Sequence, residues 1–212
     1  WVWVIPFSNG NTSLGFVGDP DFFEQFTDAG DIPAQYRKML AKEPDLAERF
    51  KDSELLWEPR VLQGWSATTE TFFGNGFVLT GNVTEFLDPV FSSGVTLASV
   101  SAQKAAHLVV RHLKGGEQID WMEEYMKFMQ RGVDVFRTYV NSWYDGTLYK
   151  VFFAENPDQE IMAQICSVLA GYVWDESNPF VKNHEKNIQA LARYIDQKNA
   201  IPDLNKSITP GI

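Results

Sequence analysis

The sequence predicts a mixed fold of α-helices and β-strands, with the strands in the first half of the chain and an all-helical C-terminal third. Alternating large apolar residues flank Asn9-Gly10, and an apolar run, a small-residue loop and a helical pattern follow one another over residues 76–113. After Glu117 the apolar positions recur at steps of three and four, as in amphipathic helices. With 212 residues, 44% of them hydrophobic, the chain can bury a core in one domain or two intimate ones.

The first predicted element is a β-hairpin. Residues 1–7 alternate in the manner of a strand, Asn9-Gly10 is typical of a two-residue hairpin turn, and residues 13–18 supply the partner strand. Trp1 and Trp3 then share one face of the strand. Two such indoles either fill a core or form an aromatic wall beside a ligand, and the residues alone favour the core.

Two short helices and a second strand region are predicted next. Asp31, as a cap before Pro33, marks a helix start, and Pro44 separates that helix from a second one at 45–51. Residues 55–71 favour strands again, and a tight turn follows at 74–76.

The central stretch is a strand, a loop and a helix. Residues 76–80 predict a short buried strand, residues 81–94 a loop with Asp88-Pro89 and a Ser-Ser-Gly end, and residues 95–113 a helix of small and apolar residues. This order aims backbone N–H groups and the positive end of a helix dipole at an electron-rich ligand. The alternative is an ordinary connection capped by Ser92 or Ser93, and the local pattern alone favours it.

The remaining chain predicts three longer helices. Gly115-Gly116 ends the preceding helix, and the three follow over about 117–140, 158–172 and 183–198. The one cysteine, Cys166, lies in an apolar part of the second of these helices, so we expect a buried, inert thiol.

Composition excludes several classes of protein. The net charge of -10 argues against nucleic acid or an anionic membrane as a partner. No apolar run is long enough for a membrane span, and no signal-peptide pattern is present, so we expect a cytoplasmic protein. His107 and His112 have the wrong spacing for a shared metal, and common nucleophile motifs are absent. An enzyme of this sequence would therefore need a bound cofactor.

Two motifs resemble the flavin-dependent halogenases. Trp1-Val2-Trp3-Val4-Ile5-Pro6 resembles their W-x-W-x-I-P signature, and the segment from Gly81-Asn82 through Asp88-Pro89 to Ser92-Ser93-Gly94-Val95 is similar to their second flavin-binding motif. The resemblance implies a p-hydroxybenzoate-hydroxylase-type fold. Residues 1–73 would belong to a substrate-binding sheet domain, residues 74–116 to the FAD-binding domain as its C-terminal strand-loop-helix, and residues 117–212 to a helical C-terminal region.

The resemblance also implies a set of site residues. Those expected to bind FAD are Gly81, Asn82, Asp88, Pro89, Phe91, Ser92, Ser93, Gly94, Val95 and Thr96. Ser93 and Gly94 match the halide-binding positions. The residues expected to wall the flavin off from the substrate are Trp1, Trp3, Ile5 and Pro6. We expect this wall and the Ser93-Gly94 pair to face one cleft.

The implied activity is halogenation of an aromatic substrate, free or carrier-bound, by reduced FAD, oxygen and a halide ion, with a flavin reductase as partner. Phe91 stands where the tryptophan-halogenating branch has Glu, which favours phenolic or pyrrole-type substrates. Asn82 stands where the family usually has Asp, so the contact to the cofactor loses a charge. No catalytic residue is assigned within this chain, because the catalytic Lys and the G-x-G-x-x-G of the family lie upstream of Trp1.

The apolar first residues therefore lead us to expect the C-terminal part of a longer protein, with an N-terminal half needed for a complete FAD site. Three alternatives remain from the sequence. One is a flavin monooxygenase or dehydrogenase/reductase of the same fold without halide chemistry. Another is a non-enzymatic binding module, with Trp1 and Trp3 on a flat platform. The third is a bare fragment whose apolar surface the missing half would cover.

Overall fold

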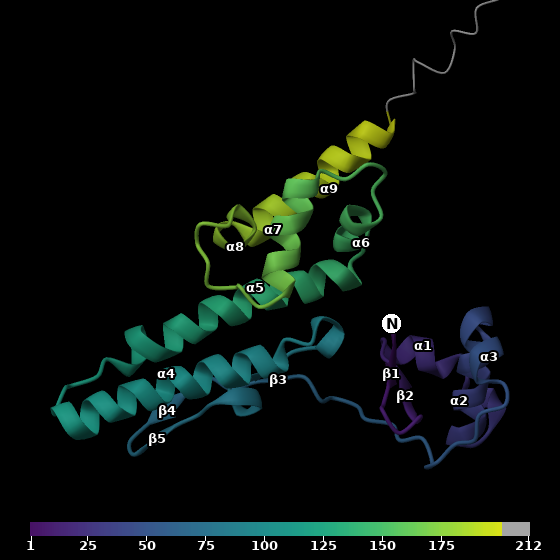
Figure 1. Ribbon diagram of the computed structural model, residues 1–212, viewed down its shortest axis with the longest axis horizontal. Coiled ribbons are helices and arrows are strands. Elements are labelled where there is room, and N and C mark those ends of the chain that lie inside the picture. The colour runs from purple at the N-terminus through teal and green to yellow at the C-terminus, as the bar shows by residue number, and fades with distance from the viewer. Residues whose placement is uncertain (201–212) are drawn as a thin grey trace, which may run out of the picture. The chain divides into compact units, whose positions relative to one another are not determined.

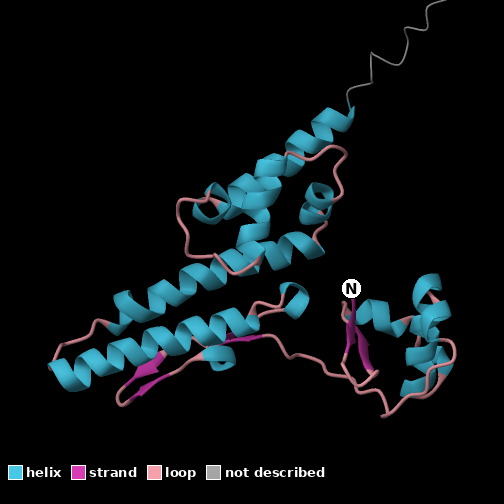
Figure 2. Cartoon of the chain, viewed as in Figure 1, coloured by secondary structure: helices cyan, strands magenta, loops and turns pink. Residues whose placement is uncertain are grey.

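The chain forms two compact units, Trp1–Gly64 and a second unit from Trp65 onward (Figure 1). The computed structural model describes residues 1–200, so the end of the predicted region 117–212 lies outside the described residues. Helices predominate over strands (Figure 2), and the predicted mixed α and β class is confirmed. The assignment of ranges 1–73, 74–116 and 117–212 to substrate, flavin and helical regions stays a prediction.

The first unit begins with the predicted hairpin. Strand β1, Val2–Pro6, pairs antiparallel with β2, Thr12–Phe16, so that Trp3 lies opposite Gly15. The predicted two-residue turn at Asn9-Gly10 is wrong, because Pro6 pairs with Thr12 and residues 7–11 all lie in the loop. A hydrogen bond of 2.8 Å from the N–H of Phe7 to the carbonyl of Asn11 extends the ladder by one step and closes this longer loop.

Short helices complete the first unit. They are α1, Pro20–Glu24, a 3-10 turn, Thr27–Ala29, α2, Ile32–Ala41, and α3, Pro44–Phe50. Asp31 caps α2, since its Oδ1 accepts a hydrogen bond of 2.9 Å from the N–H of Ala34, as its place before Pro33 predicts. Helix α1 was not predicted, because one turn carries too little periodicity to detect.

The predicted strands between residues 55 and 71 are wrong apart from β3, Ala67–Thr68. Leu56, Trp57 and Leu62 are 57%, 80% and 79% exposed. Pro59 cannot donate a hydrogen bond to a strand ladder, and Gly64 adopts a φ of 62°, which breaks an extended course. The apolar residues of this segment therefore lie in an exposed connection and not in strands.

The second unit opens with two small antiparallel pairs. Strand β3 pairs with β6, Glu85–Phe86, and β4, Phe73–Gly74, pairs with β5, Phe77–Val78. The tight turn predicted at 74–76 is confirmed between β4 and β5. The strand predicted at 76–80 is only two residues long and is not buried, because Phe77 is 52% exposed.

Helices form the body of the second unit. They are α4, Gly94–Gly115, a π-helical turn, Met122–Met126, α5, Lys127–Tyr144, α6, Thr147–Phe152, α7, Gln159–Leu169, α8, Pro179–Lys182, and α9, His184–Ala200. Helices α4 and α5 lie side by side (Figure 1). The three longer helices predicted after Gly115 are confirmed with shifted ends, and α6 was not predicted.

One contiguous core joins these helices. Its largest fully buried side chains come from helices far apart in the sequence and include Leu108, Tyr125, Met129, Phe136, Tyr139, Leu148, Ile165 and Ile188. The three-and-four spacing of apolar residues predicted this burial on α5, α7 and α9. Cys166 is exposed instead of buried, because it lies beside Ile165 on the outward face of α7.

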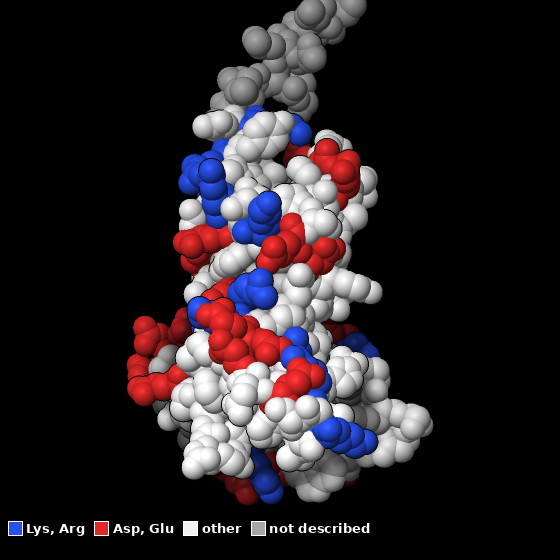
Figure 3. Space-filling model, turned by 90° about the vertical axis from the view of Figure 1, so that its left-hand side faces the viewer, with Lys and Arg blue, Asp and Glu red and all other residues white. Residues whose placement is uncertain are grey.

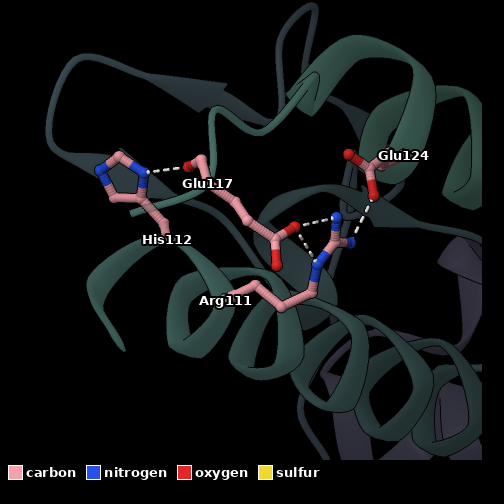
Figure 4. Close-up of polar contacts among 4 residues, drawn as sticks. All are labelled: Arg111, His112, Glu117 and Glu124. Atoms are coloured by element: carbon pink, nitrogen blue, oxygen red, sulfur yellow. Dashed lines mark hydrogen bonds and ion pairs between the residues drawn. The ribbon is translucent and has the colours of Figure 1, made fainter. Parts of the chain in front are cut away.

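An ion-pair cluster ties the end of α4 to the π-helical turn (Figure 4). Arg111 donates to Glu117 at 2.6 and 2.8 Å and to Glu124 at 2.6 Å, and Nδ1 of His112 lies 2.8 Å from the carbonyl oxygen of Glu117. The hydrogen bond from Arg111 lowers the pKa of the Glu124 carboxyl. All these side chains reach solvent, so the cluster fixes the turn without adding a large stabilisation.

Charges of both signs are mixed on the face of the molecule that Figure 3 shows. No helix within residues 1–200 is long and apolar enough to cross a membrane.

Candidate functional site

The candidate site is the loop between β5 and α4. It begins at Gly81, whose positive φ favours glycine over other residues. Gly81 has a φ of 67°, and a methyl group placed on it would lie 3.5 Å from the Cβ of Ala98 in α4. Its N–H donates to Oγ of Ser101 at 2.8 Å, and that hydroxyl donates in turn to the carbonyl of Ala98 at 3.0 Å. The structure thus sets Gly81 against helix α4.

The start of the loop is also held from the α5 side. The hydroxyl of Tyr125 donates to the carbonyl of Leu79 at 2.5 Å, and this tyrosine is completely buried. Burial raises the pKa of Tyr125 to about 12, although a contact with Ser101 acts in the opposite direction. Tyr125 therefore stays a neutral hydrogen-bond donor at any physiological pH.

The middle of the loop is shaped by Asp88. Its Oδ1 accepts a hydrogen bond of 2.9 Å from the N–H of Val90, which starts the 3-10 turn Pro89–Phe91. Its Oδ2 accepts a hydrogen bond of 2.7 Å from the hydroxyl of Tyr144 in α5. The aspartate predicted to bind the cofactor thus already holds the loop in shape.

Phe91 and Ser92 lead into the helix. The Phe91 ring packs edge-on against Trp143 with 5.9 Å between the ring centroids. Ser92 adopts the left-handed conformation, with a φ of 54°, which few residues other than glycine take up. This turn directs the chain into α4.

The first turn of α4 lacks a side-chain cap. Ser93 precedes the helix, but its backbone is helical and its buried hydroxyl accepts no capping hydrogen bond, so the predicted serine cap is wrong. Val95 is 79% exposed at this turn. The first N–H groups of a helix have no partner within it, so this turn presents donors and a positive dipole end.

Asn82 and Gly171 lie next to this first turn. Oδ1 of Asn82 would lie 3.8 Å from a Cβ placed on Gly94, and Oγ1 of Thr96 would lie 3.0 Å from a Cβ placed on Gly171. Asn82 is therefore beside the helix start, and Gly171 packs closely against Thr96 where a side chain would be crowded. The structure thus places Asn82 beside the first turn of α4 and Gly81 further along the same helix, against Ala98, whereas the binding of FAD by these residues stays a prediction.

The tryptophan motif lies in the other unit. The rings of Trp1 and Trp3 are 6.0 Å apart, and Trp3 covers Gly15 and donates to Oγ of Ser13 at 3.0 Å. Ile5 is 50% exposed and Pro6 is also exposed. The shared face of the two tryptophans is confirmed, whereas a common cleft with Ser93-Gly94 stays a prediction.

Sequence reasoning missed Glu85, which lies within the loop. Glu85 is 3% exposed, and its Oε1 lies 3.0 Å from Nη2 of Arg137 and accepts a hydrogen bond of 3.0 Å from Thr68. Its Oε2 is buried without a hydrogen-bond partner. The one signal in the sequence was a charged residue directly before two apolar residues, Phe86 and Leu87.

Solved structures and curated relatives agree on the fold and class. The solved structure of a flavoprotein/dehydrogenase from Cytophaga hutchinsonii is 52% identical to this chain, with a TM-score of 0.89. The match covers 94% of this chain and 48% of that one. A 1H-pyrrole-2-carbonyl-[peptidyl-carrier protein] brominase of Pseudoalteromonas luteoviolacea is 25% identical over 82% of this chain and 42% of its own length. A sulochrin halogenase of Aspergillus terreus is 32% identical over 55% of this chain and 22% of its own. These likenesses define a halogenase-like flavoprotein.

The chain belongs to the tryptophan halogenase family, whose model matches residues 1–187. It spans about half the length of the solved relative and less of the two curated relatives. The family supports a flavin cofactor and favours a flavin enzyme over the tryptophan-rich binding module.

Proposed function

We propose that the whole protein is an FAD-dependent, halogenase-like oxidoreductase, and that residues 81–96 form the isoalloxazine side of its flavin site. The observation that carries this proposal is the uncapped first turn of α4, presented by the loop that matches the family motif. Helix N-termini stabilise negative charge, and a reduced flavin ring accumulates such charge. When bound, the reduced flavin would react with oxygen to supply the oxidant for a halide ion.

The residues around this turn fit such a ligand. Gly94 has no side chain, and Asn82 lies close enough to contact a group bound at the helix start. Backbone amides at Ser93 and Gly94 would hold a halide ion, and those of Val95 and Thr96 would face the flavin ring. Pro89, Phe91 and Ser92 would pass along the ring, while Gly81 and Asp88 keep the loop in this shape.

The substrate side rests on the hairpin. Trp1, Trp3, Ile5 and Pro6 would separate the flavin from an aromatic substrate, so that halide is oxidised instead of the substrate being hydroxylated. The exposure of Ile5 and Pro6 supports a surface that something else covers. In this proposal the N-terminal half supplies the ADP site and the catalytic lysine, and a flavin reductase supplies reduced FAD.

Phe91 supports a phenolic or pyrrole-type substrate over free tryptophan. The relatives include an enzyme named for a pyrrole carried by a peptidyl-carrier protein and one named for sulochrin. The proposed substrate is therefore a phenol or pyrrole, free or on a carrier protein.

The direct test uses the full-length protein with reduced FAD, oxygen, bromide and a panel of phenols and carrier-bound pyrroles. Mass spectrometry is expected to find a brominated product. A hydroxylated product without bromine would assign the protein to the monooxygenases of this fold instead. A purified protein with no flavin absorbance after loading with FAD would overturn the proposal.

A sharper test removes a single N–H group. Val95→Pro deletes one donor in the first turn of α4, where proline is tolerated, as Pro33 is in α2 of this chain. Val95→Ala keeps the donor and is the matched control. We expect Val95→Pro alone to weaken FAD binding about tenfold, the effect of losing one hydrogen bond to a charged group. Equal affinities in the two variants would remove α4 from the flavin site.

A further inference from the structure

Helix α5 and the turn before it contact the candidate flavin loop at four points between Leu79 and Phe91. Four contacts follow almost the same order in both segments: Tyr125 with Leu79, Arg137 with Glu85, Tyr144 with Asp88, and Trp143 with Phe91. Two are hydrogen bonds, one is an ion pair and one is an aromatic contact. A rigid helix that holds four successive points of a loop fixes the position of everything between them.

The Glu85–Arg137 contact is the unusual one of the four. Glu85 is only 3% exposed, and its Oε2 has no hydrogen-bond partner. The Arg137 side chain is 37% exposed, but the attraction within such a pair often does not offset the cost of burying the carboxylate, so stability does not explain a carboxylate here. A defined geometry for the loop does explain it, because a buried charge tolerates only one arrangement of its partners.

The arrangement around Glu85 is directional. Thr68 of β3 donates to Oε1 from one side, and Arg137 approaches the same oxygen from α5. The guanidinium of Arg137 is itself held by Asp134, one turn earlier on α5, at 2.5 Å. Glu85 thus ties strands β3 and β6 to the helix, nine residues before the first residue of α4.

We propose that α5 is the brace of the flavin loop and that Glu85 and Arg137 are positioning residues for the flavin. They act through residues 86–94, which they hold against α5 so that the first turn of α4 meets the ring at a fixed place. This inference rests on the proposed function of the loop. It adds two residues that were not among the predicted site residues and a helix from the C-terminal region.

The test compares two Glu→Gln variants in the full-length protein loaded with FAD. Glu85→Gln keeps the shape of the side chain and removes its charge. Glu176→Gln is the matched control, since Glu176 pairs with Arg131 of the same helix at 2.9 Å but both side chains are more than 60% exposed. We expect Glu85→Gln to weaken FAD binding about tenfold and to shift the absorbance bands of the bound flavin, with no change in Glu176→Gln.

A milder variant keeps the experiment decisive if Glu85→Gln folds poorly. Thr68→Val preserves volume and removes only the hydroxyl that donates to Glu85. It is expected to change the flavin spectrum in the same direction by a smaller amount. A folded Glu85→Gln or Thr68→Val protein with the wild-type FAD affinity and spectrum would overturn the positioning role.

Hydrogen exchange without flavin separates the brace from the proposed function. In Glu85→Gln the amides of residues 81–94 are expected to exchange about tenfold faster than in the wild type, and those in Glu176→Gln at the wild-type rate. If the wild-type protein binds no flavin while this difference is present, the function fails and the brace remains. Unchanged exchange in Glu85→Gln would overturn the brace itself.

Discussion

The two units hold their family motifs in opposite ways. In the first unit the tryptophan motif lies on a two-stranded hairpin, and Phe26 is the buried hydrophobic side chain of that unit among the described residues. In the second unit the candidate flavin loop is attached to a core that several helices share. The difference indicates that contacts within this chain fix the shape of the loop. The exposed strand end at Ile5 and Pro6 is instead suited to contact another segment or molecule.

The largest expected effect is on the core of the second unit. Phe136→Ala removes a ring that is 1% exposed on α5, and we expect a loss of about 3–5 kcal/mol in the free energy of unfolding. Phe7→Ala, at a position 54% exposed on the hairpin, should change it by less than about 0.5 kcal/mol. Urea unfolding followed by circular dichroism measures both. Similar losses in the two variants would contradict the contrast between the units.

Phe26→Ala tests the core of the first unit. Phe26 is completely buried, but its neighbour Phe22, with 5.2 Å between the ring centroids, is partly exposed and free to relax into the space. We expect a loss of about 3 kcal/mol, at the low end for such a change, confined to the first unit. Amide exchange resolved by residue should increase in residues 1–64 and stay constant in α5. Faster exchange in α5 would show that the units unfold together.

Ser101→Ala tests how firmly α4 holds the loop. The change leaves the buried N–H of Gly81 without its acceptor, which should destabilise the second unit by about 1–3 kcal/mol. Ser99→Ala, on the exposed side of the same helix, is the control and should be almost neutral. Thermal unfolding and exchange of the Gly81 amide report the difference. A neutral Ser101→Ala would mean that the loop keeps its shape without this bond.

The smallest expected effect is a pH dependence confined to the second unit. Burial lowers the pKa of His184 below 6.5, although the charges of Asp134 and Glu185 act against this. The unfolded chain therefore binds this proton more readily, so stability is complete above pH 6.5 and falls as the pH drops toward the folded pKa. His184→Gln, which can still hydrogen-bond Thr138, should show a smaller loss of stability between pH 7 and 5. An equal loss in both proteins would contradict the assignment.

Much of this fold follows from local pattern. Helices α2, α4, α5, α7 and α9 were predictable because caps, glycine stops and a helical apolar period mark them. The structure of region 55–71 was not predictable. Its β-branched and aromatic residues lie in an exposed connection that has no partner strand over most of its length. Local pattern cannot show which segments pair, since pairing depends on residues far apart in the chain.

The candidate site divides in the same way. The Gly81 turn and the start of α4 were predictable from a glycine and a Ser-Ser-Gly sequence before a helix. Glu85 and Arg137 were not, because 52 positions separate them and each alone resembles an ordinary charged residue. The positive φ of Ser92 was equally hidden, since serine seldom adopts it.

The π-helical turn Met122–Met126 accommodates one extra residue where the chain enters α5. A π turn contains one residue more than an α-helix of the same course. Deleting one residue there would restore regular α-helix and keep the flanking segments in nearly the same register, whereas deleting one residue within the regular helix α5 would rotate everything after it by about 100° relative to everything before it. Tyr125 and Arg137 now contact Leu79 and Glu85 of the same loop, and that rotation would separate the two contacts. A single-codon deletion between Lys127 and Arg137 would thus be more damaging than one at the π-helical turn.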